Sequence, residues 1–302
     1  MKKSLIYLKL AIGIFIIWFI SKKIGFTNIT SVLLKINVTY IPLIVVLYLV
    51  TLLISCYKLK IILDSQSYKS DFWRFFMQFL TSISVGMFLP GKIGDFSLSY
   101  FLKKEYNVKV SHSFSAILID KVITLTFFIL ITLTGISILF SELIKSYINI
   151  AIAILIFGVV FITFILYGRS LIKLILGKYY ENFVETTTFS VDIVKHKNYL
   201  LMINLFLTLI RSVVLTFMYY FAFLSFSYNI SFINLFFINS ISIFISVIPI
   251  SISGLGIREG SAVFLLDKLN VPNTITFNSF IIVTIVIYLI AIINLILYKH
   301  KN

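Results

Sequence analysis

Six ionisable side chains lie within or directly beside apolar stretches of this sequence. They are three cations and three anions: Arg211, Lys121, Arg258, Asp95, Asp120 and Glu259. An ionised group near the centre of a bilayer costs roughly 3 kcal/mol on insertion scales, so such groups face a partner or a water-filled cavity rather than lipid. We expect the six to meet in the interior of a helical bundle.

The two arginines are suited to binding phosphate, because a guanidinium group matches phosphate oxygens bidentately. We expect Arg211 and Arg258 to contact a phosphate, with Lys121 assisting and the three carboxylates as counter-ions. Structural alternatives remain open. Arg211 could form an internal ion pair, Arg258 and Glu259 could form a local pair at a helix start, and Lys121 with Asp120 could lie at the membrane interface.

Two apolar segments, one in each half of the chain, are interrupted in the same order by proline, glycines and a carboxylate. Broken backbone within a membrane survives only where it packs against protein or lines a polar cavity. Paired interruptions in corresponding halves point to the substrate site of a transporter. Alternatively, the prolines only kink ordinary spans. The interrupting residues are Pro90, Gly91 and Gly94 in the first segment, and Pro249, Gly254 and Gly256 in the second.

The composition predicts an all-α integral membrane protein with a single domain over residues 1–302. The chain is 60% hydrophobic and only 12% charged, and a soluble protein of this length needs a more charged surface. Several apolar runs reach the roughly 20 residues that a helix needs to cross a bilayer. They cover residues 36–57, 122–141, 146–168, 212–257 and 269–298.

The net charge of +15 does not indicate a nucleic-acid-binding protein, because most basic residues stand at the ends of apolar runs. The single cysteine, Cys56, has no partner for a disulfide and offers no thiolate cluster for a metal. We therefore expect no cofactor, no metal and no nucleic-acid partner.

The distribution of basic residues predicts about six spanning helices and two re-entrant hairpins that enter from opposite faces, a possible inverted repeat. Both termini are then cytoplasmic, in a multi-pass protein of the cell membrane. Lys58 and Lys60 fall in the basic segment that follows the second span, and residues 169–198 are the only candidate linker. The expected spans are about 1–20, 40–57, 114–140, 147–167, 200–224 and 276–298, and the hairpins cover 75–91 and 232–269.

Both interrupted segments also resemble signatures of a known family. Residues 90–95, 99–102 and 113–121 resemble the first signature, and residues 249–259 the second, of the lysylphosphatidylglycerol synthase transmembrane-region family, also called the flippase-like domain family. The resemblance covers nearly the whole chain. It implies a membrane domain that moves lipids or lipid-linked sugars between leaflets, without the soluble aminoacyl-transferase domain of the bifunctional members.

Two positions depart from the family pattern. Leu98 or Ser99 stands where an arginine usually follows the first glycine-acidic pair, and Asp120-Lys121 replaces a Glu-Arg pair. Because of these two departures, the resemblance does not identify the headgroup of the substrate.

The preferred function is the flipping of an anionic lipid or a polyprenyl-phosphate-linked sugar, which makes the chain a transporter rather than an enzyme. Its partner would be a membrane lipid or lipid-linked glycan. One alternative is a membrane glycosyltransferase with a polyprenyl-phosphate sugar donor, in which Asp64, Asp71 or Asp95 would serve, although no Asp-x-Asp pair is present. Another is a non-catalytic partner of envelope-biosynthesis enzymes.

Overall fold

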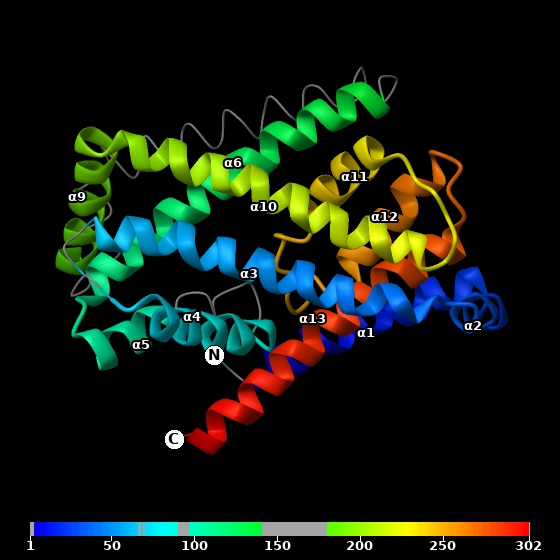
Figure 1. Ribbon diagram of the computed structural model, residues 1–302, viewed down its shortest axis with the longest axis horizontal. Helices are drawn as coiled ribbons and strands as arrows, with labels where there is room; N and C mark the ends of the chain where they lie inside the picture. Colours follow the sequence, from blue (N-terminus) through cyan, green and yellow to red (C-terminus); the bar gives the residue numbers. More distant parts are fainter. Residues whose placement is uncertain (1–2, 66–67, 69, 90–96, 141–179, 302) are drawn as a thin grey trace.

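The computed structural model describes residues 3–65, 68, 70–89, 97–140 and 180–301. Its regular elements are helices, which confirms the predicted all-α class (Figure 1). They are α1 (Lys3–Ile24), α2 (Phe26–Leu33), a short 3-10 turn η1 (Val38–Tyr40), α3 (Ile41–Asp64), α4 (Phe72–Met87), α5 (Ser97–Tyr106), α6 (Val110–Leu139), α9 (Tyr180–His196), α10 (Asn198–Leu224), α11 (Phe232–Ile245), α12 (Ile257–Asp267) and α13 (Asn273–Lys301).

Four helices of the described part are long and apolar enough to cross a membrane: α3 together with η1, α6, α10 and α13. The helices α1 and α2 form a further candidate span that is bent by 90° between them. Gly25 occupies the bend with a φ of 97°, a conformation that side chains other than glycine rarely adopt. The predicted span at 147–167 lies outside the described residues.

The predicted hairpin at 75–91 corresponds to the single helix α4, and its proposed break at Pro90 and Gly91 lies outside the described residues. Helix α5 follows in a segment that was expected to be cytoplasmic. The predicted hairpin at 232–269 corresponds to α11 and α12, and we call α4–α5 and α11–α12 the two hairpins below. The helix α4 runs inward from the end of the molecule where α9 lies, and α5 returns beside it (Figure 1). The helices α11 and α12 pack together and enter from the opposite end, where α2 and the start of α13 are found (Figure 1). The side chain of Asp71 begins α4 by accepting a hydrogen bond from the backbone N–H of Arg74 at 3.0 Å.

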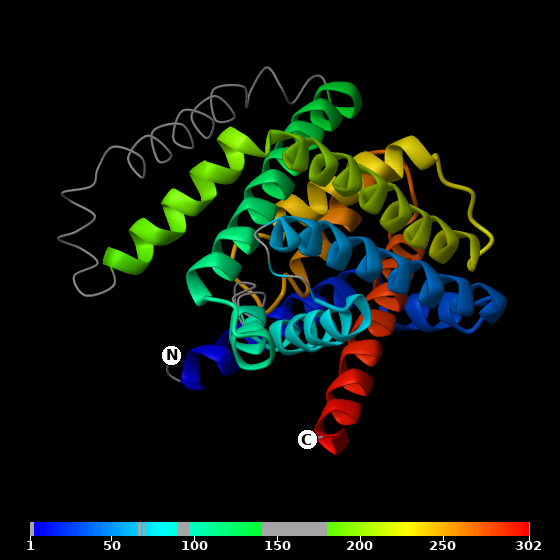
Figure 2. The same cartoon turned by 60° about the vertical axis from the view of Figure 1, so that its left-hand side comes forward.

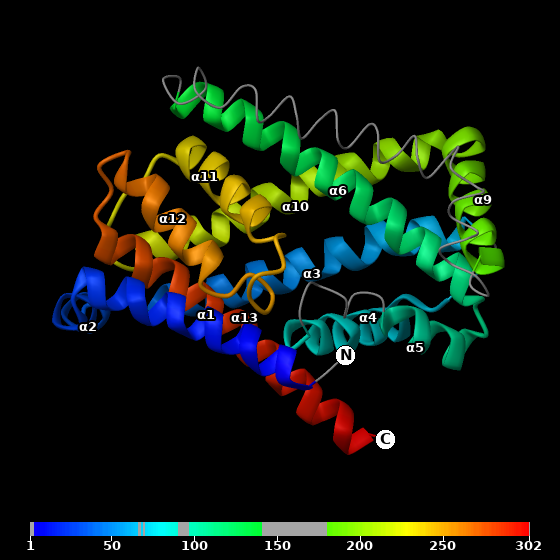
Figure 3. The same cartoon turned by 180° about the vertical axis from the view of Figure 1, so that it is seen from behind.

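Helix α1 packs closely against the start of α12, as the view from behind shows (Figure 3). A Cβ atom added to Gly256 would lie 2.7 Å from the carbonyl oxygen of Gly13 and 2.9 Å from Cβ of Ile16. The backbone at Gly256 is therefore covered by protein rather than by lipid, which suits an interrupted segment within a bilayer.

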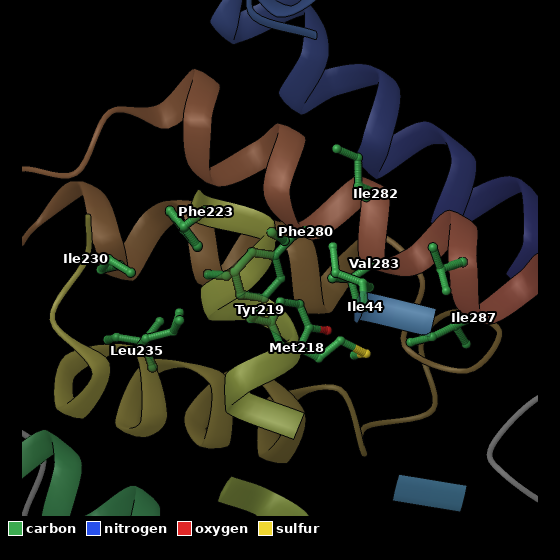
Figure 4. Packing of buried hydrophobic residues seen from close by; sticks show 14 of the residues in the cluster. Ile44, Met218, Tyr219, Phe223, Ile230, Leu235, Phe280, Ile282, Val283 and Ile287 are labelled. Carbon is green, nitrogen blue, oxygen red and sulfur yellow. The ribbon is translucent and has the colours of Figure 1, made fainter. Parts of the chain in front are cut away.

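Two clusters of buried apolar side chains hold the described helices together. The larger one lies between α3, α10, α11, α12 and α13, and its centre is the pair Tyr219 and Phe280, whose rings are 4.4 Å apart (Figure 4). The second joins the end of α3 to α4, α5 and α6 around Phe75, Leu98 and Ile117. Large apolar side chains also cover the outside of the helices, for example Phe206 at 61% exposure, and acyl chains are their expected neighbours.

The described part of the polar stretch expected as a linker, residues 180–198, is mostly the helix α9. It lies alongside the first part of α6 (Figure 2), and its Ile193 is 1% exposed. The hydroxyl group of Ser115 donates a hydrogen bond to the carbonyl oxygen of Thr186 at 2.8 Å. This segment is therefore packed onto the bundle and does not act as a free connection.

The structure also corrects the placement of Lys58 and Lys60, which were expected at a cytoplasmic flank of the membrane. Helix α3 continues through both residues to Asp64, and Lys58 and Lys60 are 1% and 8% exposed. Counting basic residues treats a lysine as the end of a span, whereas here the helix carries Lys58 into the protein interior.

Candidate functional site

A cavity of about 260 Å³ lies between the two hairpins and the long helices. Side chains from α3, α4, α6, α10, α12 and α13 line it, together with the end of α11 and the loop that follows α11. Its charged lining consists of Lys58, Asp120, Lys121, Arg211 and Arg258. Four helices thus supply charges to one cavity, and three of them, α3, α6 and α10, are candidate membrane spans.

Helix α3 presents one polar face to this cavity. Tyr48, Thr51, Ser55 and Lys58 all line it, and they follow one another at intervals of three or four residues. This spacing places side chains on one side of a helix. The hydroxyl groups of Thr51 and Ser55 donate to the carbonyl oxygens of Tyr48 and Thr51, so the helix itself satisfies them.

Lys58 and Asp120 form an ion pair across α3 and α6. Their Nζ and Oδ1 atoms are 2.9 Å apart, and their side chains are 1% and 11% exposed. Lys58 also donates to the hydroxyl groups of Thr124 at 2.8 Å and Thr208 at 3.0 Å. The side-chain amide of Asn204 donates to Asp120 Oδ1 at 3.1 Å. The network therefore joins α3, α6 and α10 at one wall of the cavity.

Arg258 and Glu259 form a second charged group at the start of α12. Arg258 Nη2 donates to Glu259 Oε1 at 3.0 Å and to the hydroxyl group of Thr284 on α13 at 2.6 Å. The Thr284 hydroxyl in turn donates to Glu259 Oε1 at 2.6 Å. Glu259 Oε2 accepts from the backbone N–H of Gly256 at 2.7 Å. This carboxylate is completely buried and fixes both the arginine and the first turn of α12.

The guanidinium group of Arg258 is only partly used by these contacts. Its Nη2 atom is engaged, whereas its Nε atom is buried without a hydrogen-bond partner. Buried donors in proteins are nearly always satisfied, and leaving one unmade costs about 1–3 kcal/mol or more for a charged group. The arrangement therefore favours an anion next to Arg258.

The two interrupted segments meet at the cavity. The hydroxyl group of Ser253, in the loop between α11 and α12, lies 3.3 Å and 3.2 Å from the carbonyl oxygens of Gly86 and Met87 at the end of α4. Ser253, Gly254 and Gly256 all have positive φ values, of 50°, 76° and 80°. This tight loop places Ser246 and Ser253 on the cavity wall.

The predicted site residues divide into three groups. Arg211, Arg258, Lys121 and Asp120 line the same cavity, whereas Glu259 lies behind Arg258 and holds it. In the second interruption, Gly254 and Gly256 are buried and Pro249 is exposed, so the proline does not face the cavity. Four predicted residues lie outside the described part of the chain: Pro90, Gly91, Gly94 and Asp95.

Sequence reasoning missed Lys58, Tyr48 and Thr284. The polar residues of α3 recur at helical spacing inside an apolar stretch, and this pattern could have identified Lys58 as a residue of the interior. Thr284 gave no such signal, because a single threonine within an apolar helix commonly bonds to its own backbone.

Two of the three carboxylates proposed for a transferase are engaged elsewhere, and the third, Asp95, lies outside the described residues. Asp64 pairs with Lys60 at 2.5 Å on the same helix, and Asp71 caps α4. Among the described residues, no group of three or more histidine, cysteine, aspartate or glutamate side chains could hold a metal ion.

Comparison with known proteins places the chain in a family. The family model described as "Lysylphosphatidylglycerol synthase TM region" matches residues 6–294. No curated protein and no solved structure matches the chain. Since the family model covers almost the full length, the expectation drawn from the two interrupted segments is confirmed: this chain belongs to the family of the lysylphosphatidylglycerol synthase transmembrane region.

Proposed function

We propose that this protein moves a lipid with a phosphate-containing anionic headgroup between the two leaflets of a membrane. The observation that carries the proposal is the cavity between the two interrupted segments, with Arg211, Arg258 and Lys121 in its wall. The headgroup would pass through this cavity while the acyl or prenyl tails stay in the surrounding lipid. Membership in a family of membrane domains supports the same reading.

The half-satisfied guanidinium group of Arg258 is the best candidate for the first phosphate contact. Glu259 and Thr284 fix its orientation through Nη2, so little rotamer entropy remains to be lost on binding. The buried Nε atom, which has no partner in the protein, would donate to a phosphate oxygen. Arg211 lines the cavity from α10 and Lys121 from α6, so a bound phosphate would bring three separate helices together.

The proposal includes a location and a partner. Lysines flank the apolar parts of α1 and α13, and such residues favour the cytoplasmic side. We therefore place the protein in the cell membrane with both termini in the cytoplasm. Its partner is a phospholipid or a polyprenyl-phosphate-linked glycan of that membrane.

A reconstitution experiment tests the proposal. The purified protein is placed in phosphatidylcholine vesicles that contain NBD-labelled phosphatidylglycerol, NBD-labelled phosphatidic acid or an NBD-labelled prenyl phosphate. Dithionite then measures how fast the probe leaves the inner leaflet. We expect Arg211→Gln and Arg258→Gln each to slow movement of at least one probe by tenfold or more, which corresponds to about 1.4 kcal/mol of lost binding.

Lys268→Gln is the matched control, because Lys268 is an exposed cation that follows α12 and does not line the cavity. This variant removes the same charge and should keep the wild-type rate. Movement of no probe above protein-free vesicles, or full activity of both arginine variants, would refute the proposed function.

A further inference from the structure

The ion pair between Lys58 and Asp120 lines the cavity but is not needed for the phosphate contacts described above. We propose that this pair is a proton-binding site that couples movement of the anionic lipid to movement of one proton in the same direction. The inference rests on the proposed function and deepens it, because it names a source of energy for transport. It is carried by the hydrogen-bond geometry of Lys58 and Asp120 and by their burial.

The donor capacity of Lys58 is fully used. A protonated lysine has three N–H donors and no acceptor. Lys58 has three acceptors within 3.0 Å, on Asp120, Thr124 and Thr208, and its side chain is 1% exposed. An anion that enters the cavity can bind Lys58 only if one of these acceptors leaves. The carboxylate of Asp120 is the one that a phosphate oxygen replaces in charge as well as in hydrogen bonding.

Asp120 then loses its cation in a buried position. After separation from Lys58, it keeps the hydrogen bond from the side-chain amide of Asn204 at 3.1 Å. A buried carboxylate without its cation is strongly disfavoured, and such a group takes up a proton instead. The step is balanced: one proton from the water at the open side of the cavity binds the Asp120 carboxylate, and Lys58 stays protonated and binds the phosphate oxygen. Release of the lipid on the other side returns the proton to water and restores the pair.

The surrounding charges support this exchange. The charged side chains that act on the pair are Lys121, next to Asp120 on α6, and Arg211 on α10. Both are cations, so they favour the ionised carboxylate while the cavity holds no anion. A bound phosphate offsets these cations and thereby favours protonation of Asp120.

Within the described residues, the other elements next to the pair bring no further charge to it. Helix α4 and the start of α5 contribute Phe79, Ser82 and Leu98 to the cavity wall, and α11, which packs on α6, contains no ionisable residue. The carboxylate of α9 that contacts α6 is Glu185. Its partners there are Lys109 at 3.2 Å and His112 at 3.6 Å, at the start of α6 and two turns or more before Asp120.

A pH gradient across reconstituted vesicles tests the coupling. The probe is NBD-phosphatidylglycerol, because a phosphodiester does not change its own charge near neutral pH. With one proton moved per lipid, a difference of one pH unit should enrich the probe up to about tenfold in the leaflet that faces the more alkaline side. The final leaflet ratio does not depend on how fast a variant works, so it separates coupling from rate.

Asp120→Asn should abolish this enrichment and leave an even distribution at the end of the experiment. Asp64→Asn is the matched control, because Asp64 forms the other lysine–aspartate pair of α3 and does not line the cavity. This variant should keep the tenfold enrichment. If the wild-type protein moves the probe but leaves it evenly distributed under a pH gradient, coupling is refuted while the proposed function stands.

A second measurement tests proton binding with the wild-type protein alone. It therefore needs neither a folded variant nor movement of the probe across the bilayer. Short-chain dihexanoyl phosphatidylglycerol is added to the wild-type protein in weakly buffered detergent solution, and the pH is followed. We expect an uptake of about one proton for each bound lipid. Binding of the lipid with no uptake of protons, or no binding at all, would overturn the inference.

Discussion

The buried carboxylate of Glu259 should be the most sensitive single position of the charged site. It is 0% exposed and accepts hydrogen bonds from Arg258, Thr284 and the backbone of Gly256. In Glu259→Ala the arginine and the N–H of Gly256 both lose their acceptor. Removing one partner of a buried ion pair costs about 3–5 kcal/mol, which corresponds to a fall in melting temperature of about 6–20 °C for a protein of this size class.

Cys56 provides the assay for this prediction. It is the only cysteine of the sequence and is 0% exposed, so a fluorogenic maleimide reacts with it only when α3 separates from the bundle. Thermal unfolding in detergent can therefore be followed without introducing a label site. Thr284→Val, which removes a hydroxyl group and leaves the ion pair, should cost only about 1–3 kcal/mol.

A double-mutant cycle separates the ion pair from general packing. If Glu259 acts by pairing with Arg258, then Glu259→Ala should cost less in an Arg258→Met background, with a coupling energy of about 1–3 kcal/mol. Strictly additive effects would show that Glu259 stabilises α12 only through the backbone of Gly256. A melting temperature of Glu259→Ala within a degree or two of the wild type would refute the reasoning as a whole.

Three further predictions concern the hairpins. Gly254→Ala should destabilise the protein by several kcal/mol, because φ is 76° and the new Cβ atom would lie 2.5 Å from Cβ of Ser246, and Cys56 reactivity will measure the loss. Ser253→Ala should lower the free energy of unfolding by no more than about 1 kcal/mol, since the single hydroxyl proton is shared between two long contacts, but it should raise hydrogen exchange in α4. Asp71→Ala removes the N-cap of α4 and should cost about 1 kcal/mol in the same unfolding assay.

The sequence was sufficient to predict the fold class and the interruption between α11 and α12, because both follow from the chemistry of the bilayer. Apolar runs of spanning length determine the long helices, and proline with glycine identifies the loop between α11 and α12. Arg211 and Arg258 were identifiable for the same reason, since a charge inside an apolar run has to face protein or water.

Other features depend on tertiary contacts that no local pattern encodes. Lys58 was assigned to a cytoplasmic flank because it opens a series of basic residues. The helical spacing of the polar residues before it hinted at an interior position, but its partner Asp120 is known only from the tertiary contact. The 90° bend at Gly25 was also not predicted, because one glycine among apolar residues does not reveal the direction of the next helix. Thr284 became a site residue only through its distance of 2.6 Å from both Arg258 and Glu259.

The contact between the two hairpins has a consequence for the evolution of the family. Ser253 bonds to main-chain carbonyl groups of residues 86 and 87, so this joint does not itself depend on which side chains stand at those two positions. Correlated substitutions between relatives would therefore not reveal the contact. At Ser253 the φ of 50° disfavours a β-branched side chain, so threonine should be accepted poorly there although it carries a hydroxyl group.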